Sequence, residues 1–307
     1  MIADCAIDPE VFARWRYFQS LYEDFGVGQG RLISQFPSKW NKIVVTRAQE
    51  LIAEGENTVI QVKTLEEKLF EQRFKRKLKK SGGREFDSST DWGTAATSVE
   101  PAFDLVITHS ETACPHAVCS ETMLKGDAPF KRLRQDNIPR TKEDLVHAAS
   151  VLISSCKEFI LVDPNFRADE PRFYAPFLYL IEQLESAGVK PARLEVHTKK
   201  KRDRRDEFHR GPQESQWKQQ IIPKLPKGWE LRVVYWDSLP TGGKPHPRFL
   251  VTEQGGLYYD HGFDTGDGTT LVTLLEDDVW EDVYNTYHAH QLPKDIHPQE
   301  HIMVFHG

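Results

Sequence analysis

Apolar positions in the first third of the chain recur at the spacing of amphipathic helices. Asp8 can cap a helix and Pro9 suits its first turn, and the apolar face then continues until Gly26 ends the run. A second helix is predicted over residues 38–54. A third begins at Thr64 with a Ser/Thr-x-x-Glu capping box. This pattern predicts a helical N-terminal region.

Residues 81–98, SGGREFDSSTDWGTAATS, are small or turn-forming and cannot build a periodic apolar face. They indicate a loop or linker. A chain of 307 residues is long enough for two domains, each with its own core. We therefore predict a helical N-terminal region with linker over residues 1–98 and an α/β domain over residues 99–307.

The α/β prediction rests on short apolar runs that alternate with helical patterns from residue 158 onward. Strands separated by helices favour a mainly parallel buried sheet, and a Gly-containing turn at 254–256 adds an antiparallel edge. The sheet is therefore expected to be mixed. The predicted strands are 159–163, 193–198, 231–236, 248–253, 257–262 and 270–275, and the predicted helices are 172–187, 213–222 and 278–288.

Composition excludes several classes of protein. With 39% hydrophobic and 28% charged residues, the chain is not collagen-like, a disulfide scaffold or wholly disordered. No apolar run approaches the roughly 18 residues that cross a bilayer, and the first residues lack the pattern of a signal peptide. We expect a cytoplasmic protein without membrane association, whose four cysteines remain thiols.

The net charge of −6 hides two basic clusters. Six of the eight residues 73–80 are basic, and they are expected to continue an amphipathic helix. Six of the seven residues 199–205 are basic, follow a predicted strand and read as an exposed loop. A cluster of this kind can neutralise several phosphates. The predicted nucleic-acid-binding residues are Lys199, Lys200, Lys201, Arg202, Arg204 and Arg205.

The segment 246–264 carries the most informative candidate chemistry. Side chains at i and i+2 share one face of a strand, so His246 and Arg248 are expected to project together. Glu253 follows at the end of this strand. After a Gly-Gly turn, the next strand returns to the same edge with Asp264. The pattern predicts an imidazole, a guanidinium and carboxylates around one site.

This spacing resembles the signature of the phospholipase D superfamily, His-x-Lys followed, after four intervening residues, by Asp and then by a Gly-containing second strand. His246, Arg248 and Glu253 fall on the three signature places, with Arg replacing the family lysine and Glu replacing the family aspartate. Asp264 echoes the second part. The resemblance covers roughly residues 145–290. It implies a phospholipase D-like mixed-sheet domain behind the helical N-terminal region.

The family chemistry assigns a role to each residue. It implies attack of one imidazole on phosphorus and protonation of the leaving oxygen by a second, with cations holding the phosphate oxygens and without a metal or other cofactor. His246 would then be nucleophile or acid, Arg248 the phosphate clamp, and Glu253 and Asp264 orienting groups. Only one motif is present, so activity implies a homodimer that pairs two copies.

Two functions follow and remain open. The substituted, single motif favours a nucleic-acid-associated protein without catalysis, a binding or accessory component of a prokaryotic defence or mobile-element system that docks nucleic acid or a partner protein. The alternative is a dimeric, metal-independent nuclease or phosphodiesterase that uses His246.

Two further groups of residues suggest metals. Cys114, His116 and Cys119 offer zinc ligands within one loop, or form an ordinary turn. Asp163 and Glu195 resemble part of a two-carboxylate nuclease centre, although position 197 is histidine rather than lysine, and a carboxylate before a proline also suits a turn. We assign no metal site to either group.

Overall fold

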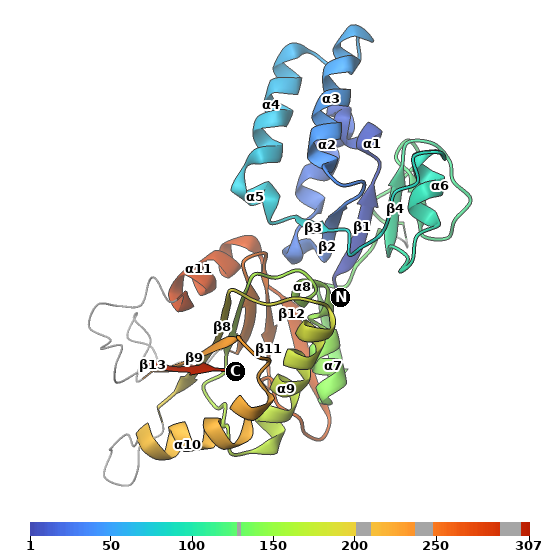
Figure 1. Cartoon of the computed structure of the whole chain (residues 1–307). Helices are drawn as coiled ribbons and strands as arrows, with labels where there is room; N and C mark the ends of the chain where they lie inside the picture. The colour runs from blue at the N-terminus through green and yellow to red at the C-terminus, as the bar shows by residue number, and fades with distance from the viewer. Residues whose placement is uncertain (128–129, 201–209, 237–247, 289–301) are drawn as a thin grey trace. The chain divides into compact units, whose positions relative to one another are not determined.

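The structure, a computed structural model, forms two compact units, Met1–Arg134 and Gln135–Gly307 (Figure 1). Each unit contains a sheet with helices packed against it, which confirms the predicted α/β fold class. Within the described residues, no helix combines the length and apolar character needed to cross a membrane. The structure describes residues 1–127, 130–200, 210–236, 248–288 and 302–307.

Unit 1 is built on a five-stranded sheet in the order β3-β2-β1-β4-β5, and every neighbouring pair is parallel. The central strand β1 pairs Cys5 with Ile33 of β2 on one side and with Leu105 of β4 on the other. Such a sheet is wound in two directions from its middle. The strands are β1 (Ala3–Ile7), β2 (Arg31–Gln35), β3 (Leu78–Lys80), β4 (Leu105–Thr108) and β5 (Ala117–Cys119).

Three helices of unit 1, α1, α4 and α6, begin where a side chain accepts a hydrogen bond from an amide of the first turn. Asp8 caps α1 by accepting a hydrogen bond from the Glu10 amide, as its position predicted. Helix α4 begins earlier than predicted, because Thr58 forms a capping box with Gln61. The helices are α1 (Pro9–Ala13), α2 (Trp15–Leu21), α3 (Trp40–Ala53), α4 (Val59–Phe70), α5 (Gln72–Lys75) and α6 (Trp92–Thr97), with 3₁₀ turns at Tyr22–Asp24 and Val27–Gln29.

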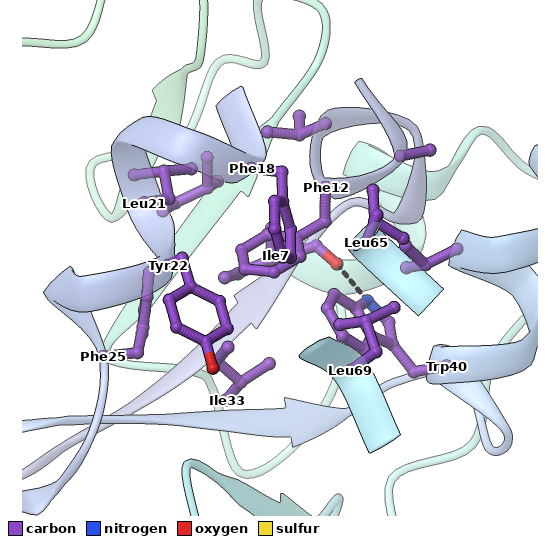
Figure 2. Close-up of a cluster of buried hydrophobic side chains, with 14 of the residues drawn as sticks. Ile7, Phe12, Phe18, Leu21, Tyr22, Phe25, Ile33, Trp40, Leu65 and Leu69 are labelled. Carbon is purple, nitrogen blue, oxygen red and sulfur yellow. Dashed lines mark hydrogen bonds between the residues drawn. The ribbon is translucent and has the colours of Figure 1, made fainter. Parts of the chain in front are cut away.

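A large apolar core lies between the sheet of unit 1 and helices α1 to α4 (Figure 2). Ile7 at the end of β1 faces this core, and its carbonyl accepts a 2.6 Å hydrogen bond from the indole of Trp40. The ring centroids of Phe12 and Trp40 lie 5.2 Å apart. On the opposite face, Ala6 packs with residues of α6 and its neighbours. Alternate residues of β1 thus bury both faces of the sheet.

The prediction of a helical region with a linker over residues 1–98, followed by one α/β domain over residues 99–307, is therefore wrong, because the first unit is itself α/β and extends to Arg134. This region contributes three strands, and the segment 81–98 contains α6. The strands are five residues long or shorter, and they include the buried charged residues Asp4, Arg31 and Lys79. A strand buried on both faces has no alternation of apolar and polar residues, so a periodicity argument cannot find it.

The basic run 73–80 is also different from the prediction. Helix α5 ends at Lys75 and the chain enters β3 at Leu78. Lys77 is buried and donates a 2.6 Å hydrogen bond to the carbonyl of Tyr22, and Lys79 is buried in a 2.7 Å ion pair with Asp4. Part of this run is structural rather than an exposed basic face.

Unit 2 is built on an eight-stranded mixed sheet in the order β13-β9-β8-β7-β10-β11-β12-β6. Strands β7, β8 and β9 are parallel, and all other neighbouring pairs are antiparallel. The strands are β6 (Gln135–Pro139), β7 (Glu158–Val162), β8 (Arg193–Lys199), β9 (Glu230–Trp236), β10 (Phe249–Thr252), β11 (Gly256–Tyr259), β12 (Thr269–Leu274) and β13 (Ile302–His306).

Helices cover both faces of this sheet. Trp280 and Tyr287 of α11 pack with Val162 and Val251 on one face. On the other face, Tyr259 donates a 2.9 Å hydrogen bond to the carbonyl of Leu145 in α7, and α7 packs against α9. The helices are α7 (Lys142–His147), α8 (Ser150–Ile153), α9 (Pro171–Ser186), α10 (Arg210–Gln220) and α11 (Asp277–Tyr287), with a 3₁₀ turn at Ile222–Lys224.

Candidate functional site

A pocket of about 480 Å³ lies in unit 2 at the ends of the central strands β7 and β8. Six of its lining side chains are cationic, whereas Asp264 is the carboxylate among the described lining residues. We call this site the basic pocket. Its lining residues are Arg140, Pro164, Asn165, Arg167, Arg172, Phe173, Lys199, Lys200, Arg248, His261 and Asp264.

The strand order explains why these residues meet. Strands β7 and β8 run parallel, so the residues that follow β7 lie at the same end of the strands as Lys199 of β8. Strand β10 runs antiparallel to β7, and Phe249 is paired with Val162 at the end of β7. Arg248, which directly precedes β10, therefore lies at the same end of the strands.

Arg248 is held in place by backbone and carboxylate groups. Its Nη1 donates a 2.5 Å hydrogen bond to the carbonyl oxygen of Asp260, and its Nε lies 3.9 Å from Oδ1 of Asp163. Gly262, with φ of +103°, makes this approach possible. A Cβ atom at Gly262 would lie 2.8 Å from Oδ2 of Asp163 and 3.0 Å from Cδ of Arg248.

Asp163 lies beneath the pocket and is fully buried. Its two oxygens accept hydrogen bonds from the amides of Asn165 (2.8 Å) and Phe263 (3.3 Å). Burial raises the pKa of its carboxyl to about 6, although the two amides and Arg248 act in the opposite direction. A buried carboxylate of this kind attracts and orients the guanidinium beside it.

Asp264 links two guanidinium groups that come from distant parts of unit 2. Arg140, which follows β6, places Nη2 2.8 Å from Oδ1 of Asp264. Arg172 in the first turn of α9 places Nη1 3.8 Å from Oδ2 of the same residue. One carboxylate thus holds two cations at the wall of the basic pocket, which keeps their charges together without a bound ligand.

His261 and His197 of unit 2 lie in two different environments. His261 lines the basic pocket with an exposed side chain, and its Nδ1 lies 3.5 Å from Oδ2 of Asp260. His197 is buried in β8, where it accepts a 2.9 Å hydrogen bond from the indole of Trp236 and lies 3.1 Å from a carboxylate oxygen of Glu195. Of these two, His261 is the one that can meet a ligand in the pocket.

The predicted site residues are distributed unevenly. Arg248 and Asp264 line the basic pocket, together with Lys199 and Lys200 from the predicted basic cluster. His246 lies outside the described residues. So do Lys201, Arg202, Arg204 and Arg205.

Glu253 does not belong to this site, contrary to the prediction. It follows the far end of β10 and accepts hydrogen bonds from the amides of Lys157 (2.8 Å) and Glu158 (3.0 Å), where β7 begins. Five residues of extended chain separate it from Arg248, about 16 Å. The carboxylate of Glu253 therefore joins β10 to β7 at the end of these strands that lies away from the pocket.

The carboxylates Asp163 and Glu195 do not form a metal centre. Glu195 points to the same face of the sheet as His197 and Trp236, where Ile160 and Val162 also pack. Asp163 follows Val162 and therefore points to the opposite face. In the described part of the chain, no three His, Cys, Asp or Glu residues are grouped so that they could hold a metal ion, the Cys114–Cys119 loop included.

Sequence reasoning missed Arg140, Arg167 and Arg172. Each is a single charged residue near the end or start of an element, with no motif around it. Arg167 is also paired with Asp169 (2.8 Å) and Glu170 (2.5 Å). The polar residues directly after the predicted strand 159–163 were the one available signal, because ligands bind where parallel strands end.

No family model and no curated protein matches this chain. Among solved structures, it is similar to TrmBL2, an archaeal chromatin protein that shows a novel mode of DNA binding, with 12% identity and a TM-score of 0.29. The match covers 55% of this chain and 54% of that structure. At this TM-score we base no argument on the likeness.

Proposed function

We propose that unit 2 binds the phosphate groups of a nucleic acid in the basic pocket, as a phospholipase D-like binding component. The observation that carries this proposal is the convergence of six cationic side chains, from five separate stretches of the chain, on one cavity. Nucleic acids present repeated phosphates, and arginine and lysine are the side chains that contact them.

The charge balance of the pocket supports an anionic ligand. Asp264 offsets part of the charge of Arg140 and Arg172, and Asp169 and Glu170 offset part of that of Arg167. Asp163 offsets part of the charge of Arg248, and the two lysines of the β8 end add further positive charge to the lining. A planar guanidinium held by Asp163 and Asp260 is ready to contact two phosphate oxygens at once.

The sequence context adds a second line of support. Lys199 and Lys200 begin the basic cluster 199–205, so the chain that leaves the pocket carries four more cations. Further phosphates of the same strand would meet these residues. The resemblance of residues 246–264 to the phospholipase D signature also concerns Arg248, which lies in the pocket.

Fluorescence anisotropy with labelled single-stranded DNA and RNA tests the proposal. Replacing Arg248 by Gln together with Lys200 by Glu is expected to weaken binding at least about tenfold, because two charged contacts are lost. The slope of log K against log salt should fall by about two. Lys227→Glu is the matched control, because Lys227 is exposed before the amino end of β9. Equal affinity of the double variant and the wild type would refute the proposal.

Phosphodiester cleavage is the second candidate, and one observation favours it. His261 lines the same cavity as Arg248, so an imidazole and a phosphate clamp face one ligand. The test is incubation of labelled DNA and RNA in EDTA with the wild type, His246→Ala and His261→Ala. Cleavage that either variant abolishes supports a metal-independent nuclease. Binding without cleavage supports the binding component alone. Sedimentation of the same samples shows whether activity accompanies a homodimer.

A further inference from the structure

Unit 1 contains a second cavity, of about 540 Å³, at the carboxyl ends of β1 and β2. We call it the unit 1 cavity and define it by Asp8, Lys39, Lys42, Ile43, Phe86 and Trp92, which are among its lining residues. In open parallel sheets, ligands bind in the crevice outside the carboxyl ends of the strands. The volume lies in the range of small-molecule and cofactor sites.

One wall of the unit 1 cavity is aromatic and firmly supported. The rings of Phe86 and Trp92 pack edge to face on the buried Phe36, at centroid distances of 5.4 and 6.3 Å. Trp92 is the first residue of α6, whose first turn is capped by Asp91. Within the described residues, the buried Nε1 of Trp92 has no hydrogen-bond partner. A flat ring would pack on this wall.

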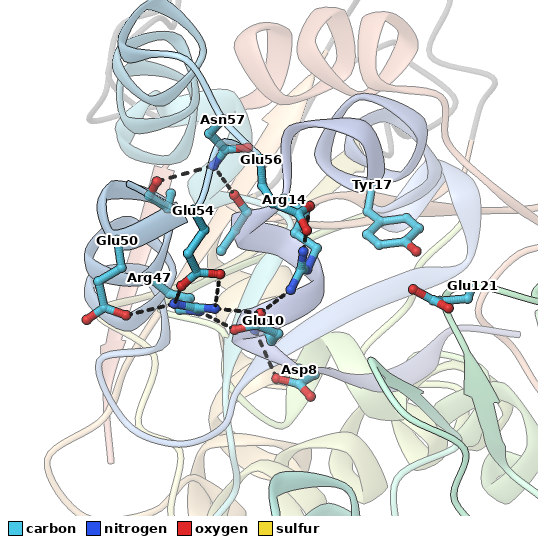
Figure 3. A network of polar contacts seen from close by, with 12 residues as sticks. Asp8, Glu10, Arg14, Tyr17, Arg47, Glu50, Glu54, Glu56, Asn57 and Glu121 are labelled. Atoms are coloured by element: carbon cyan, nitrogen blue, oxygen red, sulfur yellow. Dashed lines mark hydrogen bonds and ion pairs between the residues drawn. The ribbon is translucent and has the colours of Figure 1, made fainter. Parts of the chain in front are cut away.

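The rest of the cavity lining carries charges of both signs, with the carboxylates Asp8, Glu10 and Glu50 and the cations Lys39, Lys42 and Arg47. Arg47 is engaged by acidic groups, since it binds Glu10 and Glu50 at 2.5 and 3.1 Å and also Glu54 at 2.6 Å (Figure 3). Lys39 and Lys42 at the start of α3 are exposed, and within the described part of the chain neither has an ion-pair partner. The cavity thus combines an aromatic wall with two available ammonium groups.

We propose that the unit 1 cavity binds a nucleoside phosphate, with its base against Phe86 and Trp92 and its phosphate at Lys39 and Lys42. Ile43, which follows Lys42 in α3, adds apolar surface to the cavity lining. Asp8, whose carboxylate accepts the 2.9 Å hydrogen bond of the Glu10 amide, offers an acceptor to a hydroxyl of the sugar. This site is independent of the basic pocket in unit 2.

Isothermal titration calorimetry on the full chain tests this proposal. The background is the Lys200→Glu, Arg248→Gln variant, so that the basic pocket does not contribute to nucleotide binding. The probes are the four nucleoside 5′-monophosphates, then adenosine and ribose 5-phosphate. Adenosine monophosphate is expected to bind, and adenosine and ribose 5-phosphate at least about tenfold more weakly, because each lacks one of the two contacts.

Two variants separate the two ends of the cavity. Lys42→Glu should weaken nucleotide binding about tenfold and leave adenosine unchanged, because only the phosphate contact is lost. Trp92→Ala removes one ring of the aromatic wall, so the affinities for nucleotide and adenosine should fall together while that for ribose 5-phosphate is unaffected. Lys63→Glu, an exposed lysine on α4, is the control for charge. The proposal would be overturned if none of the four nucleotides binds, or if both cavity variants bind the nucleotide with the same affinity as the background protein.

Discussion

The guanidinium of Arg248 lies beside the buried carboxylate of Asp163, with 3.9 Å between Nε and Oδ1, where β7 ends and β10 begins. Asp163 is surrounded by donors, because two backbone amides and this guanidinium point at it. The direction in which a cation of the basic pocket points therefore depends on a residue that no ligand can touch. This relationship makes Asp163 a positioning residue whose protonation can be measured.

Asp163 is expected to make the stability of the chain dependent on pH. Burial raises the pKa of its carboxyl from 3.8 to about 6, so the folded chain binds this proton more tightly than the unfolded chain. The stabilisation by this proton is complete below about pH 4 and is lost as the pH rises through about 6. Two units of pKa correspond to about 3 kcal/mol.

Chemical denaturation of the wild type and Asp163→Asn across this range measures the effect. The asparagine does not titrate, so the free energy of unfolding of the variant should gain about 3 kcal/mol relative to the wild type between about pH 4 and pH 8. The lost hydrogen bond to one of the two amides adds a constant offset only. Parallel curves for the two proteins would show that the pKa of Asp163 is not raised.

Gly262 is expected to be intolerant of even one added carbon. Gly262→Ala places a Cβ 2.8 Å from Oδ2 of Asp163 on a backbone with φ of +103°, so the variant should lose about 3 kcal/mol in the free energy of unfolding. Gly268 is the matched control, because it has a positive φ of +82° and open space around its Cα. Gly268→Ala should cost about 1 kcal/mol. Equal costs would mean that the contact with Asp163 contributes nothing.

Six of the eight strands of unit 2 could be predicted from the sequence, because they are apolar runs bounded by turn residues, whereas β6 and β13 were not predicted. The predicted strand 193–198 is β8 (Arg193–Lys199), and the predicted helix 172–187 is α9 (Pro171–Ser186). The short strands of unit 1 could not be predicted in this way. Strand β3 consists of Leu78, Lys79 and Lys80, and only its pairing with β2 makes it a strand.

The site could be predicted only in part, for a geometric reason. Arg248 and Asp264 lie close in sequence, and one hairpin brings both to the pocket. Arg140 and Arg172 reach the pocket through the order of eight strands, which no local pattern encodes. Glu253 was misplaced because its spacing from Arg248 matches a signature, whereas the two residues lie at opposite ends of β10.

Glu253 is therefore expected to contribute to stability and not to ligand binding. Glu253→Ala removes the acceptor of two amides at the start of β7, which should cost about 2 kcal/mol in the free energy of unfolding. Affinity for labelled DNA and RNA should stay within about twofold of the wild type. Thermal denaturation and anisotropy on the same sample measure both effects. Loss of binding at full stability would return Glu253 to the functional site.

Lys79 is expected to behave as a core residue, although it lies in a run of six basic residues. Its ammonium group pairs with Asp4 at 2.7 Å, and both side chains are more than nine-tenths buried. Arg84 also reaches the same carboxylate, at 2.9 Å. Lys79→Met leaves Asp4 with one cation in place of two. Removing one partner of a buried pair costs several kcal/mol, and the remaining arginine should reduce this cost to about 2 kcal/mol.

The neighbouring Lys80→Met provides the comparison, because Lys80 is exposed in the same strand. It should change the free energy of unfolding by less than about 0.5 kcal/mol. The double variant Lys79→Met, Arg84→Met should lose more than the sum of the two single variants, because the buried carboxylate then has no cation. Urea denaturation of the four proteins measures this coupling. Additive costs would show that the two cations stabilise Asp4 independently, and a neutral Lys79→Met would contradict the buried pair.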